Sequence, residues 1–318
     1  MNLLIIVILP ILSALAVLPF KQQQAKYISL AGALLQWCAA LALFYFYTIN
    51  PDKNGVMFFE QNYQWYQPLH INFHIGVDGI SIAMILLTAT VVLAGILVSW
   101  KEERMTKEFF FLLLLLSAGA YGFFVSLDLF TLFFFLELAV IPKFLLIGIW
   151  GSGKKEYSAM KLALMLMAGS ALVFVGLAGL YFNTSFQGEY TFDVLQIASL
   201  NIPVAVQNLF FPFVFIGFGI FTALFPFHTW VPDGHSSAPT AASMFLAGIS
   251  MKLGGYGCLR VATWLMPDAA QHYSTIIIIL ACIAILYGAF TTMMQTDLKY
   301  INAYSSISHC GFVLLGIG

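Results

Sequence analysis

The sequence predicts an all-α membrane protein, a polytopic bundle of helices that cross a bilayer many times. Of its 318 residues, 61% are hydrophobic and only 8% are charged, whereas soluble domains carry roughly 25% charged residues. The apolar residues form long continuous runs, unlike the two-residue alternation of a transmembrane β-barrel. The 13 basic and 14 acidic residues nearly balance, which gives no basic patch for nucleic acid as a partner.

Nine apolar segments are long enough to cross a membrane, and a tenth reaches the C-terminus before it completes a crossing. A spanning helix needs roughly 20 mostly apolar residues because the hydrocarbon core is about 30 Å thick. The segments lie at about 2–19, 27–48, 74–99, 109–126, 129–149, 158–182, 205–226, 240–266 and 274–294, with the last starting near 304. The first has no basic n-region and no cleavage site before Lys21, so we interpret it as a span and not a signal peptide.

The basic residues predict the orientation, because short cytoplasmic loops are rich in Lys and Arg. Most fall in loops that would share one side: Lys21, Lys26, Lys101, Arg104, Lys107, Lys154, Lys155 and Lys299. Lys53 and Arg260 fall on the opposite side, so the N-terminus is expected outside. Lys143, Lys161 and Lys252 lie within hydrophobic segments, although Lys161 is near enough to a helix end to snorkel to the surface.

The outer connections at about 49–73 and 183–204 contain aromatic residues such as Tyr63, Trp65 and Tyr66. Amphipathic rings favour the membrane–water interface, so we expect these connections to anchor the protein there. The four cysteines are widely spaced within apolar runs, a pattern that predicts neither a metal site nor a disulfide framework.

Three ionisable residues inside the predicted spans need a functional or structural reason, because each costs roughly 2.5–3.5 kcal/mol at the bilayer centre. Glu137 and Lys143 lie on one segment with Pro142 between them, and Lys252 is central in another. Glu137 and Lys143 would be about 9 Å apart along an ideal helix axis, on faces about 120° apart, so they would not pair on one face. They could form static ion pairs between helices or a proton path, and we favour the path.

A proline-rich stretch from Phe225 to Pro239 interrupts the helical pattern and contains His228 and His235. Irregular backbone at membrane depth is tolerated only where protein or water covers it. Imidazole titrates near neutral pH, so both histidines are candidate relay groups, with helix capping as the alternative. His309 begins the last apolar run among serines and is a further candidate.

Several motifs, in order, resemble one known family, the antiporter-like subunits of respiratory NADH:quinone oxidoreductase (complex I). They are Gly76-Val77-Asp78-Gly79-Ile80-Ser81, the Glu137 segment ending in Leu146-Ile147-Gly148-Ile149-Trp150-Gly151, the Phe225–His235 stretch, and Gln295-Thr296-Asp297-Leu298-Lys299 before Ala303-Tyr304-Ser305-Ser306-Ile307-Ser308-His309. The residues Ala238-Pro239-Thr240-Ala241-Ala242-Ser243 and Lys252-Leu253-Gly254-Gly255-Tyr256-Gly257 are similar to the M-type, or chain 4, branch.

The resemblance implies a helical bundle with inverted repeats and a broken helix, here near 221–239. Residues 1–108 would form the N-terminal helices and 109–318 a proton-translocating core. The subunit would work in the cell inner membrane beside sister subunits L and N. It would move protons and bind no cofactor itself, while NADH, FMN, iron–sulfur clusters and quinone belong to partners. The same ancestry leaves a cation/proton antiporter subunit or a membrane-bound hydrogenase subunit open.

By this resemblance, Glu137 and Lys252 match the functional carboxylate and central lysine of the family, and His309 matches its relay histidine. The family usually carries a lysine seven residues before the position of His228, where this chain has Phe221. It usually has an apolar residue after the proline, where this chain has Lys143. We hypothesise that Lys143 takes over the role of the missing ammonium. The family also continues beyond Gly318, so we expect the chain to be truncated before the exit-side relay residues.

Overall fold

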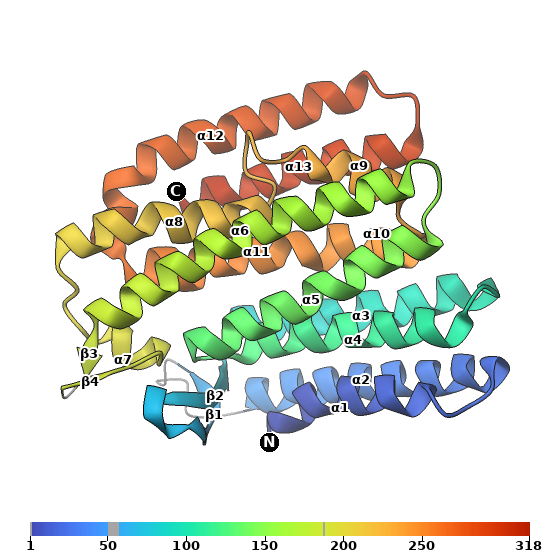
Figure 1. Ribbon diagram of the computed structural model, residues 1–318, viewed down its shortest axis with the longest axis horizontal. Helices are drawn as coiled ribbons and strands as arrows, with labels where there is room; N and C mark the ends of the chain where they lie inside the picture. Colours follow the sequence, from blue (N-terminus) through green and yellow to red (C-terminus); the bar gives the residue numbers. More distant parts are fainter. Residues whose placement is uncertain (1, 50–56, 187) are drawn as a thin grey trace.

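The computed structural model describes residues 2–49, 57–186 and 188–318. Long helices lie side by side in a bundle, and small hairpins gather at one end (Figure 1). Among the described residues, seven helical segments have the length and composition to cross a membrane: Gln22–Ile49 (α2), Gly79–Lys101 (α3, with a short 3₁₀ turn), Thr106–Val125 (α4), Leu129–Trp150 (α5), Lys155–Asn183 (α6), Val204–Phe221 (α8) and Pro267–Met293 (α12). The shorter α1 (Leu4–Val17) and the terminal α13 (Leu298–Ile317) complete the long helices.

Helix α4 lies at the centre of the N-terminal half and is buried along most of its length. Its small residues allow close packing against α5, since a Cβ added at Gly119 would lie 2.9 Å from the backbone nitrogen of Ala139. Small residues at such contacts are typical of membrane helix pairs, where van der Waals packing drives association. This packing places the inward face of α5, with Glu137 and Lys143, inside the bundle.

Aspartate side chains begin four of the helices. Asp78, Asp128, Asp193 and Asp297 each accept hydrogen bonds from backbone N–H groups in the first turns of α3, α5, α7 (Val194–Ala198) and α13. Such caps satisfy donors that the helix itself cannot pair. The first three lie at the end of the molecule that holds the two hairpins, residues 58–77 and residues 185–186 paired with 189–190, which we call the hairpin end. Helices α3, α5 and α7 therefore start at fixed points there.

The predicted broken helix is confirmed. Helix α8 ends at Phe221, and the chain resumes as α9 (Trp230–Ser237), α10 (Thr240–Phe245) and α11 (Met251–Gly257). Two π-helical segments, Leu246–Ser250 and Cys258–Thr263, flank α11. The expected helix at 205–226 is therefore wrong in its last turn, because Pro226 cannot donate a backbone hydrogen bond and restricts the residue before it.

The hairpin end contains strands that the sequence analysis did not predict. Strands β1 (Phe58–Tyr66) and β2 (Ile71–Val77) pair antiparallel, as do the short β3 (Ser185–Phe186) and β4 (Glu189–Tyr190). The helix expected from residue 74 is wrong at its start, since 74–77 belong to β2 and the Asp78 cap sets the first helical residue at Gly79.

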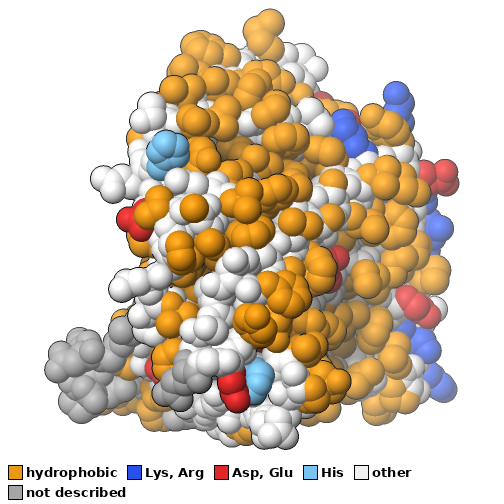
Figure 2. Space-filling model, turned by 60° about the vertical axis from the view of Figure 1, so that its left-hand side comes forward, with side chains coloured by type: hydrophobic (Ala, Val, Ile, Leu, Met, Phe, Trp, Pro, Cys, Tyr) orange, Lys and Arg blue, Asp and Glu red, His pale blue; other side chains and the backbone are white. Residues whose placement is uncertain are grey.

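Most basic residues gather on one side of the bundle, as their positions in the sequence predicted. The Lys and Arg side chains in view gather along one edge of the molecule, and apolar side chains cover most of the surface between the ends (Figure 2). Arg260 lies at the opposite, hairpin end, where it pairs with Asp78. Lys53, the other residue expected there, lies outside the described residues.

Candidate functional site

Glu137 and Lys143 both lie on the inward side of α5. Lys143 is 1% exposed, and Glu137 is half-buried beside the Ser170 hydroxyl of α6. Neither the Lys143 Nζ nor the Glu137 Oε1 has a hydrogen-bond partner among the described residues. The two groups act on each other only through space, in agreement with the expected lack of a direct pair on one face.

The Lys143 ammonium reaches the last turn of α8. Its Nζ lies 5.9 Å from the centre of the Phe221 ring, within the range of a cation–π contact. Phe221 is fully buried and is the residue that stands where the resemblance places a lysine. The structure thus brings Lys143 of α5 next to the α8 position at which the resemblance implies a lysine.

Lys252 lies where regular α-helical hydrogen bonding is interrupted. Its half-buried side chain donates to the Ala247 carbonyl, inside the π-helical segment that precedes α11. Segments of π-helix often occur at functional sites, because they redirect backbone carbonyls. The irregular backbone here supplies an acceptor for the central lysine.

His235 is fully buried on α9 and its ring bridges two parts of the broken helix. Its Nδ1 lies 2.9 Å from the Ser243 hydroxyl of α10, and Lys252 is close enough to act on it electrostatically. The Nε2 atom has no partner among the described residues. This arrangement leaves one ring nitrogen free to exchange a proton.

His228 precedes α9 and is 5% exposed. It stacks on Phe225, with centroids 5.4 Å apart, and meets the edge of Tyr287 at 4.8 Å. Its Nδ1 also has no partner in the described part of the chain. His309, in contrast, is exposed on α13, and no contact within the described residues brings it to the other predicted relay residues.

Buried side-chain atoms without a partner concentrate at the predicted relay. Eight such atoms occur in the described residues, and four belong to Glu137, Lys143, His228 and His235. Ser250, two residues before Lys252, contributes a fifth. Most buried polar atoms in proteins are hydrogen-bonded, so these exceptions mark side chains that water or a moving proton would have to satisfy.

The sequence analysis missed two ion pairs, one beside the broken helix and one at the hairpin end. Lys161 of α6 binds Asp233 of α9 at 2.6 Å, beside the broken helix. Arg260 binds Asp78 and donates from Nε to the Tyr256 hydroxyl at 3.3 Å, and that hydroxyl lies 2.9 Å from Ser81. Asp233 and Asp78 stood within the quoted motifs, but pairing them required knowledge of which helices meet.

No group of three or more His, Cys, Asp or Glu in the described ranges is placed to hold a metal ion. The arrangement of Glu137, Lys143, Lys252 and the two buried histidines is suited to holding and passing protons. These groups lie on α5, α9 and α11 and along the break between α8 and α9.

Comparison with known proteins identifies the family. Residues 126–318 match the family model described as NADH:quinone oxidoreductase/Mrp antiporter, TM. The chain belongs to this family. Chain 4-2 of the NAD(P)H-quinone oxidoreductase of Synechocystis is 36% identical over 314 residues, which covers 97% of this chain and 55% of that protein. Subunit M of the NADH-quinone oxidoreductase of Rickettsia prowazekii is 36% identical over 322 residues, covering 98% and 64%.

Solved structures agree with this family assignment. A chain of respiratory complex I from Thermus thermophilus matches with a TM-score of 0.87 and 26% identity over 99% of this chain and 64% of that one. The Mrp complex of Dietzia has the same fold, with a TM-score of 0.84 at 20% identity over 99% and 58%. The chain spans 55% to 64% of the length of the two curated relatives and the complex I chain.

Proposed function

We propose that this chain is the proton-translocating part of an M-type subunit of NADH:quinone oxidoreductase. It would lie in the cell inner membrane with its N-terminus outside and would contact the sister subunits L and N. NADH oxidation and quinone reduction would take place in partner subunits that hold FMN and iron–sulfur clusters. The single observation that carries the proposal is the set of unpartnered buried atoms on Glu137, Lys143, His228 and His235.

The proposed path uses Lys143 as a proton carrier beside Glu137 and Phe221. A carboxylate close to an ammonium stabilises its charged form, and its withdrawal favours release of the proton. Lys143 has no other partner to hold its charge in the described chain, so a small movement of Glu137 would decide whether it holds the proton. His228, His235 and Lys252 would continue the path along the broken helix.

Proton pumping by the assembled complex in proteoliposomes tests the role of Lys143. We expect Lys143→Met to lose most proton pumping per NADH oxidised, because the ammonium in contact with Phe221 is removed. Adding Phe221→Lys to the Lys143→Met variant should restore pumping, since an amine returns to the same space from α8 in place of α5. Lys154→Met, at an exposed loop position, is the matched control and should pump normally. Normal pumping by Lys143→Met would refute the relocated lysine.

A cation/proton antiporter or membrane-bound hydrogenase subunit is the second candidate, since the fold is shared with the Dietzia Mrp complex. Neighbouring genes for quinone-oxidoreductase subunits would favour the first reading, and antiporter or hydrogenase genes would favour the second. If the buried charges serve only as a scaffold, Glu137→Ala would leave pumping intact and weaken assembly.

A further inference from the structure

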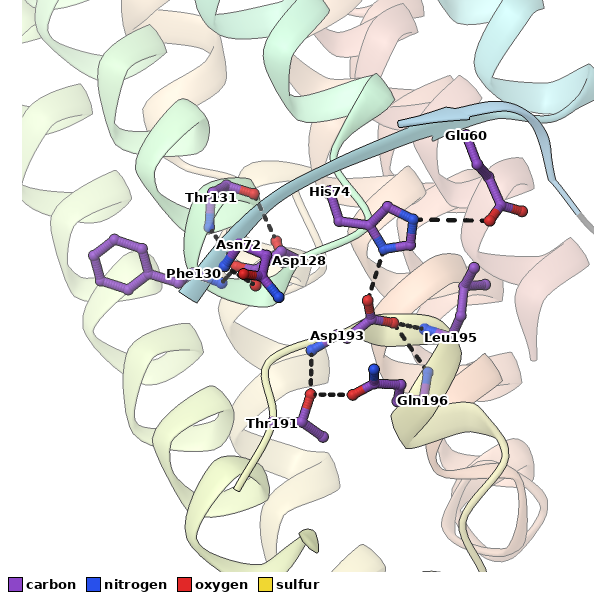
Figure 3. Close-up of polar contacts among 10 residues, drawn as sticks. All are labelled: Glu60, Asn72, His74, Asp128, Phe130, Thr131, Thr191, Asp193, Leu195 and Gln196. Atoms are coloured by element: carbon purple, nitrogen blue, oxygen red, sulfur yellow. Dashed lines mark hydrogen bonds and ion pairs between the residues drawn. The ribbon is translucent and has the colours of Figure 1, made fainter. Parts of the chain in front are cut away.

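A buried histidine at the hairpin end lies between carboxylates from different elements (Figure 3). His74, on β2, is 7% exposed. Its Nδ1 lies 2.6 Å from Oδ2 of Asp193, and its Nε2 lies 3.8 Å from Oε2 of Glu60 on β1. Both ring nitrogens therefore face an acidic group, an arrangement that the doubly protonated imidazolium satisfies best.

The carboxylates around His74 also fix the ends of two helices. Asp193 caps α7 through its Oδ1, and Asp128 caps α5 while accepting from the Asn72 backbone N–H on β2 at 3.3 Å. The backbones of Asp128 and Asp193 pair in an isolated antiparallel β-bridge. The cluster is thus the place where the hairpin, the start of α5 and the start of α7 are held together.

The charges near His74 favour proton uptake. Burial alone would lower the pKa of His74, but the hydrogen bond to Asp193 and the charges of Asp193, Glu60 and Asp128 outweigh it and raise that pKa above its ordinary value. Burial raises the pKa of Asp128 to about 6. Two members of the cluster therefore bind protons more tightly than they would in an unfolded chain.

We propose that His74, Asp193, Glu60 and Asp128 form a proton-binding site that couples the pH at the hairpin end to the docking of β1 and β2 on α5 and α7. With the proton bound, the imidazolium joins the hairpin to Asp193. As pH rises, His74 loses the one positive charge of the group and Asp128 gains a negative one, so repulsion among the four residues increases. The site holds the hairpin most firmly in acid.

The biological meaning of this site rests on the proposed function and orientation. If the hairpin end faces the side to which protons are delivered, acidification of that side tightens the hairpin as the proton gradient grows. The proton binding itself does not depend on pumping. It is therefore measured in the resting complex, where failure of the site and failure of the pumping proposal give separate results.

Hydrogen–deuterium exchange of the whole complex in nanodiscs, without NADH, tests the site. The measured quantity is the protection of peptides covering 58–66 and 71–77 relative to α4 peptides, a ratio that cancels the intrinsic pH dependence of exchange. Between about pH 5.5 and pH 8.5, where imidazole titrates, we expect this ratio to fall about tenfold, because the charge-assisted hydrogen bond from His74 to Asp193 is lost.

Variants separate a proton site from a static brace. His74→Gln keeps a hydrogen-bonding side chain but cannot carry the charge, so its hairpin protection should vary little with pH. The matched control is His70→Gln in the turn of the same hairpin, which removes a half-buried histidine 3.3 Å from Glu189 and should retain the wild-type response. If His74→Gln fails to assemble, Asp128→Asn provides the test, since it keeps a capping oxygen and should weaken the response. A flat ratio in the wild type, or an unchanged response in His74→Gln, would overturn the proposal.

Discussion

The hairpin end and the broken-helix region both bury titratable side chains, but they satisfy them differently. At the hairpin end, His74 and Asp193 bind each other, and Asp128 receives three backbone N–H groups. In the broken-helix region and on α5, the Nζ of Lys143 and one nitrogen of each buried histidine have no partner within the described residues. We call the first, around His74, Asp128 and Asp193, the paired region. We call the second, which comprises the broken helix and the inward face of α5, the unpaired region.

Buried groups with and without hydrogen-bond partners suit different roles in the protein. An unsatisfied buried polar group costs about 1–3 kcal/mol, so a protein that keeps several of them in one region gives up stability there. Groups that are fully hydrogen-bonded are held in one geometry and resist movement. We therefore infer that the unpaired groups serve proton movement, and that the paired groups serve attachment of the hairpin.

The largest expected effect is at Lys252, the central lysine of the unpaired region. Lys252→Met should lower the rate of proton pumping about 100-fold or more, a typical contribution of a positioned proton-transfer group. Pumping per NADH oxidised in proteoliposomes measures this, with Lys101→Met, at the exposed end of the 3₁₀ turn that follows α3, as control. Should Lys252→Met pump at the control rate, the unpaired region would not be the proton path.

The next effect concerns Asp128 in the paired region and depends on pH. Its pKa of about 6, against an ordinary 3.8, means that the folded state holds the proton more tightly than the unfolded chain. Stability is therefore greatest at low pH and falls as pH rises from about 4 to about 6, by about 3 kcal/mol at 1.36 kcal/mol per pKa unit.

Asp128→Asn should remove most of this decline, because the amide keeps a capping oxygen and cannot ionise. Resistance of the hairpin end to proteolysis in the assembled complex, followed from about pH 4 to pH 7, measures the change. Asp297→Asn alters another helix-capping aspartate, at the start of α13, and should leave the pH response as it is. An equal response in wild type and Asp128→Asn would mean that burial does not control this carboxyl group.

The sequence predicted much of the unpaired region and little of the paired one. Glu137, Lys143 and Lys252 stand out because each interrupts an apolar run, and Pro226 and Pro232 mark the broken helix without any tertiary information. The contact of Lys143 with Phe221 followed from a resemblance, since nothing in the spacing of 143 and 221 brings them together. The exposure of His309 depends on how α13 is rotated in the bundle, which periodicity alone did not settle.

The paired region escaped prediction for a physical reason. Glu60, His74, Asp128 and Asp193 come from four segments that meet only after the bundle forms, and each looks ordinary in its own stretch of sequence. The residues of β2 are apolar enough to read as the start of the following helix. Only the cap at Asp78 divides strand from helix, and an aspartate at that point is equally compatible with a loop.

The smallest expected effect distinguishes the partners of His74 from one another. Glu60 lies 3.8 Å from the ring with a side chain 45% exposed, and ion pairs in contact with solvent contribute about 0–1 kcal/mol. Asp193 is buried and hydrogen-bonded at 2.6 Å. Glu60→Gln should therefore shift the midpoint of the pH response of the hairpin only slightly towards lower pH, whereas Asp193→Asn should shift it further. Hydrogen–deuterium exchange of 71–77 measures both midpoints, and an equal shift in the two variants would show that charge near the ring matters more than the direct hydrogen bond.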